Sequence, residues 1–349
     1  MIDLDDERAV AGGDPGRMLD ALALVSEHAR EGYALGRAAP VEAGGVRAVV
    51  CCGMGGSGVA GEVARSLYAD RLSVPVVTVR AHELPAFAGP DTLVVATSYS
   101  GGTAETIDAF EDALGRGCRL VAIASGGELA RRADGHVPLV RVAEGFMPRA
   151  AFGLLTFGML GVLERAGVVG ALGDEVSTAA SELEPVLETL RPAVPVAVNE
   201  AKRVARAIGS RIPVVWGAEG FAATAAARWR TEVNENAKLP AMSAALPELD
   251  HNEVVGWAAG TGSRFVVIAL RHEGERRDVA ARFAPSMEIA ADAGAETLEV
   301  WARGSTALSR LLSLVAIGDH AATYLGLLRD VDPTPIDAIA RLKQALAGT

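Results

Sequence analysis

The sequence predicts an α/β fold made of two doubly wound parallel sheets, with helices before the first sheet and after the second. Short apolar strands alternate with helical patterns from residue 46 onward, which is typical of parallel sheets covered by helices on both faces. The alternation starts again at residue 212, after a long helical stretch, which indicates that one α/β unit has been duplicated. A chain of 349 residues, half of them hydrophobic, is long enough for two such domains.

The changes of pattern also set the expected boundaries. They are an N-terminal helical segment (1–45), a first α/β domain (46–168), a helical linker (169–210), a second α/β domain (211–330) and a C-terminal helix (331–349).

Each element of the first half has its own signal. A helical period at 14–36 opens the chain, and a second helix at 59–68 follows a glycine-rich turn. An apolar helix is expected at 147–167 and a more polar helical stretch at 171–208. Short apolar runs, mostly rich in β-branched residues, predict strands at 46–52, 74–79, 93–97, 119–123 and 136–140.

The second half repeats these signals. Apolar runs predict three strands, at 212–216, 265–270 and 297–301. Helical periods surround them at 221–238, 275–283 and 306–328. Thr334-Pro335 is typical of the N-cap and first position of a further, terminal helix.

Composition excludes several classes of protein. The net charge of −11 and the pI near 5.1 leave no electrostatic footprint for a nucleic acid. The three cysteines, Cys51, Cys52 and Cys118, favour a reducing compartment and buried thiols over disulfides or a zinc site. The acidic N-terminus lacks an apolar signal region and no uncharged run approaches a membrane span, so we expect a cytoplasmic protein without a membrane partner.

Two glycine-rich and hydroxyl-rich turns follow strands of the first domain. The stretch 98–106 places three hydroxyl side chains, two glycines and a helix N-terminus together, which is a natural seat for a phosphate. An alternative is an ordinary surface loop with Thr103 as helix N-cap. The turn 53–58 follows the first strand, and both turns lie at carboxyl ends of strands, the edge where ligands bind in open parallel sheets.

The first turn also fits G-x-G-x-x-G, through Gly53, Gly55 and Gly58. This match is weak, because Arg80 stands after the second strand where dinucleotide-binding folds place an acidic residue, so dinucleotide binding is the lesser interpretation. The corresponding turns of the second domain are 216–222 and 271–275, and their glutamates would repel a phosphate. The first domain is therefore expected to bind the anion.

Four motifs together resemble the bifunctional phosphoglucose/phosphomannose isomerase family. They are Gly53-Met54-Gly55-Gly56-Ser57-Gly58, Ser98-Tyr99-Ser100-Gly101, Pro148-Arg149 and Glu232-Val233-Asn234-Glu235-Asn236-Ala237-Lys238. The resemblance implies two flavodoxin-like sugar isomerase (SIS) domains and a cofactor-independent aldose–ketose isomerase. Such an enzyme interconverts fructose 6-phosphate with glucose 6-phosphate and mannose 6-phosphate through an enediolate. The residues that would bind the phosphate are Gly55, Gly56, Ser57, Ser98, Ser100 and Thr103, with Gly102 standing where the family usually has asparagine.

Glu235 is the candidate general base. It lies near the end of a helix that Pro240 must stop, where the partial negative charge of the helix terminus disfavours an ionised carboxylate and makes it a better proton acceptor. The alternative is a solvated helix residue paired with Lys238 three positions on. The resemblance favours catalysis.

Arg149 is the candidate stabiliser of the enediolate. It follows Pro148 at the start of an apolar helix, near the ligand-binding edge of the sheet. The alternative is an ordinary surface arginine, in a chain where all but three of the 33 basic residues are arginine.

His251 and Lys343 complete the set. His251 lies in a polar loop, and a lone histidine is more often structural; the resemblance implies that it assists ring opening from the neighbouring subunit of a dimer. Lys343 falls between Ile336 and Ile339 on the apolar face of the terminal helix, where a lysine needs a partner unless it snorkels at the edge. The resemblance places such a lysine beside the ring oxygen or O1.

Two other functions stay open at this point. A sugar-phosphate sensor without turnover would share every phosphate-binding residue, so only Glu235, Arg149, His251 and Lys343 favour the enzyme. An aminosugar-forming isomerase would carry an N-terminal amidotransferase domain, which we do not expect in a chain that opens Met1-Ile2-Asp3. No cluster of histidines and carboxylates indicates a metal.

Overall fold

The first domain contains a five-stranded parallel sheet in the computed structural model, which describes residues 2–346. Met1, in the predicted N-terminal segment, and residues 347–349, in the predicted C-terminal helix, lie outside the described residues. The order is β2-β1-β3-β4-β5, the flavodoxin-like order expected from the sequence. The strands are β1 (Ala48–Cys52), β2 (Val76–Val79), β3 (Thr92–Thr97), β4 (Arg119–Ala124) and β5 (Leu139–Arg141).

The second domain contains a four-stranded parallel sheet with the order β7-β6-β8-β9. This order matches that of the first sheet when β6 to β9 replace β1 to β4, which confirms two doubly wound units of one plan. Its strands are β6 (Ile212–Ala218), β7 (Met242–Leu246), β8 (Phe265–Arg271) and β9 (Glu296–Trp301).

Strand β7 was not predicted, because Met242-Ser243-Ala244-Ala245-Leu246 lacks β-branched residues. It forms along the edge of β6, with Met242 opposite Val214 and Leu246 opposite Ala218. The strand therefore owes its conformation to its neighbour and not to its own propensity.

Several helices differ in length from the sequence-based expectation. The predicted stretch 171–208 is two helices, because Pro192 and Pro195 interrupt it. The helix expected from Met147 begins at Phe152, after a turn that contains Arg149. The helices of this half are α1 (Glu7–Gly13), α2 (Met18–Ala23), α3 (Val25–Ala38), α4 (Gly55–Leu67), α5 (Ala104–Gly115), α6 (Gly127–Ala133), α7 (Phe152–Arg165), α8 (Gly173–Leu190) and α9 (Glu200–Ile208).

The second domain adds longer helices and a segment of 3₁₀ structure. The helix expected to end at Phe283 runs on to Asp292. The elements are α10 (Phe221–Asn236), the 3₁₀ helices η1 (Glu248–His251), η2 (Glu253–Ala259) and η3 (Gly262–Arg264), α11 (Arg277–Asp292), α12 (Ala307–Leu328) and α13 (Asp337–Leu346).

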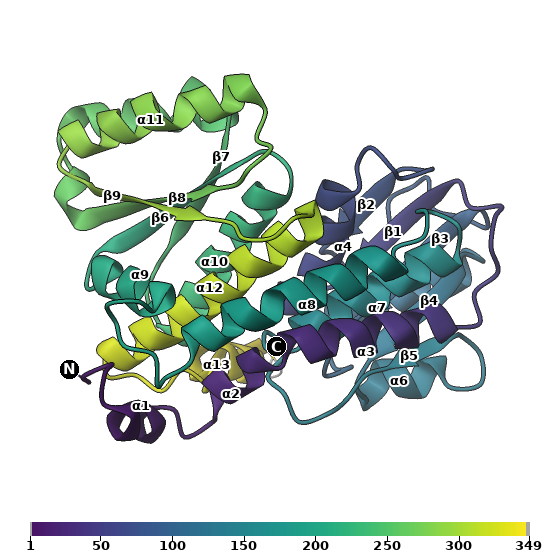
Figure 1. The fold of residues 1–349 in the computed structure, drawn as a ribbon. Helices are drawn as coiled ribbons and strands as arrows, with labels where there is room; N and C mark the ends of the chain where they lie inside the picture. The colour runs from purple at the N-terminus through teal and green to yellow at the C-terminus, as the bar shows by residue number, and fades with distance from the viewer. Residues whose placement is uncertain (1, 347–349) are drawn as a thin grey trace.

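The two sheets lie on either side of a group of long helices (Figure 1). Helices α8 and α12 pass through the middle of the molecule, and α3 lies beside α7 and α8 in the first domain. Helix α12 is the one described helix long and apolar enough to cross a membrane, but 94% of its apolar window is buried within the protein. Its hydrophobic surface is thus accounted for by packing against α8, α9 and α10.

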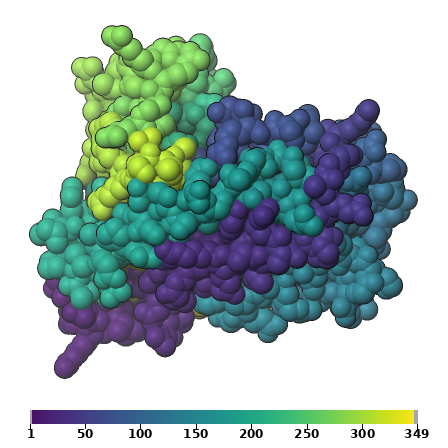
Figure 2. Space-filling model, turned by 45° about the vertical axis from the view of Figure 1, so that its right-hand side comes forward, coloured from purple at the N-terminus to yellow at the C-terminus, as the bar shows by residue number. Residues whose placement is uncertain are grey.

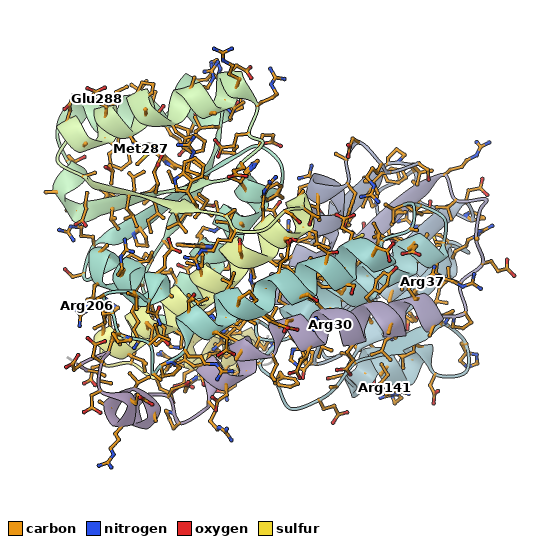
Figure 3. All side chains as sticks on the ribbon, in the orientation of Figure 1. Arg30, Arg37, Arg141, Arg206, Met287 and Glu288 are labelled. Carbon is orange, nitrogen blue, oxygen red and sulfur yellow. The ribbon has the colours of Figure 1, made fainter. Side chains whose placement is uncertain are left out.

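The N-terminal helices lie along the outside of this assembly (Figure 2). Helix α3 packs closely on α7, since a side chain at Gly36 would clash with the Gly158 backbone. Arg30 and Arg37 project from the outer side of α3 (Figure 3). They form ion pairs with Glu184 on α8 at 2.8 Å and with Glu164 on α7 at 2.9 Å.

Candidate active site

The first glycine-rich turn passes directly into a helix. Helix α4 begins at Gly55 and not at Val59 as predicted, so Gly55, Gly56 and Ser57 form its first turn. The N–H groups of a first helical turn have few partners within the helix and carry partial positive charge. Gly55 has φ of +51° and nothing within 4 Å of the position of a side chain, so its backbone faces open space that an anion could enter.

The second turn is joined to the first by a hydrogen bond. The Tyr99 N–H donates to Ser57 Oγ at 3.2 Å. Ser98 is buried, and its Oγ lies 2.9 Å from Thr103 Oγ1. Thr103 is the N-cap of α5, as the alternative interpretation required, but its hydroxyl faces Ser98 and makes no capping bond.

Ser100 stands at the tip of this turn. It is exposed, and its Oγ accepts the Gly102 N–H at 3.3 Å. The hydroxyl and N–H groups of both turns therefore line one edge of the first sheet, where a phosphate would meet them together.

Gly101 and Gly102 give a matched pair of variants for this turn. Gly101 has φ of +65°, and a Cβ atom there would clash with the Gly126 carbonyl oxygen. Gly101→Ala is expected to lower the free energy of unfolding by about 1–3 kcal/mol and to raise the KM for the sugar phosphate. Gly102→Ala meets only Ser100 Oγ, at 3.9 Å, and is expected to change stability by less than about 0.5 kcal/mol. Urea unfolding and initial rates check both, and equal effects would contradict this geometry.

Arg149 lies between the second domain and the two turns that are expected to bind a phosphate, 53–58 and 98–106, which we call the phosphate turns. A side chain at Gly56 would lie 3.3 Å from Arg149 Cα, so the backbone of Arg149 rests against the first turn. Its side chain is only 1% exposed, which rules out the ordinary surface arginine. Nε donates to Asn236 Oδ1 at 2.5 Å, and Nη2 donates to the carbonyl oxygens of Pro333 and Thr334 at 2.7 and 2.9 Å.

The remaining nitrogen of Arg149 faces Glu235. Nη1 lies 3.4 Å from Glu235 Oε2, whose side chain is 27% exposed near the end of α10. Lys238 does not pair with this carboxylate: its Nζ donates to the backbone oxygens of Glu235 and Pro333 at 2.6 and 2.9 Å. Glu235 is therefore left with a guanidinium on one side and open space on the other, as a base that must reach a substrate requires.

A hollow of about 770 Å³ opens beside Glu235. Its walls come from the end of α10 and from the segment that leads into α13. Burial lowers the pKa of the Lys238 ammonium in this wall. The lining residues are Asn234, Glu235, Lys238, Leu239, Pro240, Val331, Asp332 and 335–339.

Comparison with known proteins gives the family. The bifunctional phosphoglucose/phosphomannose isomerase of Caldicellulosiruptor bescii is 31% identical over 336 residues, which cover 95% of this chain and 99% of that protein. The chain belongs to the bifunctional phosphoglucose/phosphomannose isomerase family. A further member, from Aquifex aeolicus, is 34% identical over 303 residues, 86% of this chain and 90% of that protein.

The fold agrees with this assignment to the phosphoglucose/phosphomannose isomerases. Residues 197–346 match the model of the bacterial phospho-glucose isomerase C-terminal SIS domain. The crystal structure of a hypothetical protein from Thermus thermophilus superposes with a TM-score of 0.76, covering 99% of this chain and 93% of that one at 17% identity. That likeness shows the common fold.

Two of the predicted site residues lie apart from this cluster. His251 is exposed at the end of η1, and Lys343 is exposed on α13. Within residues 2–346, neither side chain has a hydrogen bond or ion pair to Glu235, Arg149 or the phosphate turns. On the apolar face expected for the terminal helix, Ile339 is 39% exposed and Ile336 is half-buried.

Sequence reasoning missed a buried polar cluster behind Arg149. It comprises Arg228, Glu232 and Asn236 on α10 and Asp319 on α12. The spacing of four residues between the first three was a readable signal, because it places them on one helix face. Among residues 2–346, no group of three histidine, cysteine, aspartate or glutamate side chains is arranged to hold a metal ion.

Proposed function

We propose that this protein interconverts fructose 6-phosphate with glucose 6-phosphate and mannose 6-phosphate. One observation carries the proposal: the Glu235 carboxylate lies 3.4 Å from Nη1 of a buried arginine whose backbone rests against the phosphate turn. A carboxylate, a guanidinium and a candidate phosphate-binding site, arranged in this spatial order, suit a proton transfer on a phosphorylated sugar. The names of the relatives from C. bescii and A. aeolicus support the same substrates.

In the proposed mechanism the two turns hold the phosphate through Gly55, Gly56, Ser57, Ser98, Ser100 and Thr103. Glu235 removes the proton from C1 of the open ketose, and the electron pair forms the C1–C2 double bond of an enediolate. Arg149 Nη1 stabilises the negative oxygen. The O1 hydroxyl proton passes to O2, and the protonated Glu235 then returns its proton to C2 while C1 becomes the carbonyl carbon, which gives the aldose. The reaction has no net oxidation, because hydrogen moves between adjacent carbons of one molecule.

The test is to incubate the purified protein with fructose 6-phosphate and to quantify both aldose products. Formation of glucose 6-phosphate and mannose 6-phosphate is the expected result. Saturable binding of fructose 6-phosphate without either product would favour the rival function, a sugar-phosphate sensor.

We further propose that the protein acts in the cytoplasm as a homodimer, in which His251 enters the partner's site and Lys343 joins it in ring opening. The exposure of His251, far along the chain from the phosphate turns, supports a role across an interface. The closed C2 symmetry common among homodimers would then place one His251 at each of the two sites.

Complementation tests the placement of His251. A heterodimer of a His251→Ala chain and a Glu235→Gln chain, isolated through two different tags, keeps one site with both residues intact if the histidine crosses the interface. Its activity is expected to be about half that of the wild type, whereas either variant homodimer is nearly inactive. An inactive heterodimer, or a monomeric protein at assay concentration, would rule out donation across the interface.

A further inference from the structure

A chain of hydrogen bonds runs from the candidate active site into the protein interior. Asn236 stands at its centre: Oδ1 accepts from Arg149 Nε at 2.5 Å, and Nδ2 donates to Glu232 Oε2 at 3.1 Å. Nδ2 also lies 3.5 Å from Thr323 Oγ1. Because Arg149 Nε always carries a hydrogen, the facing Asn236 atom must be the oxygen, and its NH₂ group must face Glu232.

Glu232 ends this chain: one of its oxygens, Oε2, accepts from Asn236, and the other faces a guanidinium in an ion pair. Its Oε1 lies 3.2 Å from Arg228 Nη2, and Arg228 is in turn held by Asp319 at 3.0 and 2.7 Å. The Glu232 side chain is only 2% exposed, so water does not replace these partners. A carboxylate that accepts a hydrogen bond on one oxygen and faces a guanidinium with the other is matched to its surroundings only when it is ionised.

We infer that Glu232 is a positioning residue for Arg149: it fixes the orientation of the Asn236 amide, which in turn holds Arg149 so that Nη1 faces Glu235. The inference rests on the proposed function of Arg149 in the isomerase reaction. Nη2 donates to two backbone carbonyl oxygens. The orientation of the guanidinium therefore depends on another side chain through Nε, which donates to Asn236.

The same geometry makes the chain sensitive to pH. Burial is the main cause that raises the pKa of Glu232; Asp319 and Glu235 add to the rise, while Arg228 and Arg149 oppose it. A proton on Glu232 Oε2 would meet the Asn236 NH₂ group, so two donors would face each other. The chain is therefore intact above the pKa of Glu232 and disturbed below it.

The main test is Glu232→Gln, which keeps the volume and removes the charge. A glutamine whose carbonyl oxygen faces the positive guanidinium of Arg228 turns its NH₂ group towards Asn236, which reverses the Asn236 amide and presents a donor to Arg149 Nε. We expect kcat to fall about 10- to 100-fold, with KM for fructose 6-phosphate little changed. The wild type should lose kcat as the pH falls through the raised pKa of Glu232, and the variant should lack this limb.

Two further variants separate positioning from stability. Adding Asn236→Asp to Glu232→Gln again gives Arg149 Nε an acceptor and pairs residues 232 and 236 as one donor and one acceptor, with their bond reversed and the net charge unchanged. This double variant is expected to regain at least about tenfold in kcat over Glu232→Gln. Glu275→Gln is the matched control, because Glu275 is also buried and paired at 2.8 Å with an arginine four residues earlier. It should leave kcat and its pH profile as in the wild type.

A wild-type kcat and pH profile in Glu232→Gln, or no recovery in the double variant, would overturn the inference. A wild type that binds fructose 6-phosphate without converting it would instead overturn the proposed function. The inference then still has a readout in the ¹⁵N-labelled wild type, where the Arg149 Nε–H resonance should shift as Glu232 titrates. A resonance that is constant between pH 6 and 9 would contradict it even if the variants fail to fold.

Discussion

Replacing Glu235 by glutamine is expected to lower kcat about 10²- to 10⁴-fold, the range that general base catalysis contributes. A glutamine of the same shape keeps the contact region beside Arg149 but cannot accept the proton from C1. Binding should survive, because the phosphate is proposed to bind to turns of the first domain and not to α10. Fixed-time product assays measure kcat, and calorimetric titration with fructose 6-phosphate measures binding separately.

The control for this variant lies on the same helix. Glu232→Gln is expected to lose less activity, because that side chain acts through Asn236 and does not reach the hollow. Turnover by Glu235→Gln near the wild-type rate would show that Glu235 is not the base. Loss of fructose 6-phosphate binding would show that Glu235 contributes to substrate binding.

Replacing Arg149 by lysine is expected to lower kcat about 10²- to 10³-fold, the cost of removing one donor to a developing oxyanion. A lysine keeps the positive charge, but its ammonium has three donors on one nitrogen, whereas Arg149 donates in four directions from a planar fork. It therefore cannot hold Asn236, Pro333 and Thr334 and still face Glu235. KM should change much less than kcat.

The loss of these contacts also lowers stability, so the measurement needs a matched control. Arg116→Lys provides it, because Arg116 likewise donates to two backbone carbonyls, of Leu84 and Pro85, and to a carboxylate, Asp112. Both variants should unfold at lower temperature, and only Arg149→Lys should lose activity at a temperature where both are folded. Equal activities would show that Arg149 is structural.

The sequence predicted the positions of the two glycine-rich turns, which depend on local signals, whereas their binding of a phosphate stays a proposal. A strand followed by glycine or serine and then a helix defines each phosphate turn within about ten residues, and the flavodoxin-like order brings both turns to one edge. The position of Glu235 beside the end of its helix follows from Pro240 in the same way. The domain boundaries themselves stay a prediction.

The environment of Arg149 could not be read from the sequence, because its partners lie 86 to 185 residues away. No local pattern around Pro148 reveals that the guanidinium is buried against α10 and the C-terminal segment. Strand β7 escaped prediction for a similar reason, since its pairing with β6 and not its composition makes it a strand. The roles of His251 and Lys343 stay predictions. The role of His251 depends on contacts with a second chain, and the role of Lys343 depends on contact between α13 and the site.

Isomerisation in heavy water tests the central claim most directly, because it follows the proton that Glu235 is proposed to move. The wild type and Glu235→Gln are each incubated with fructose 6-phosphate in D₂O, and the sugars are followed by NMR. We predict that the wild type forms glucose 6-phosphate and mannose 6-phosphate with deuterium at C2, and that Glu235→Gln binds the sugar but forms product and exchanges the proton at C1 at least about 10²-fold more slowly. Fructose 6-phosphate that the wild type binds but leaves unchanged, or equal deuterium exchange by both proteins, would contradict the account.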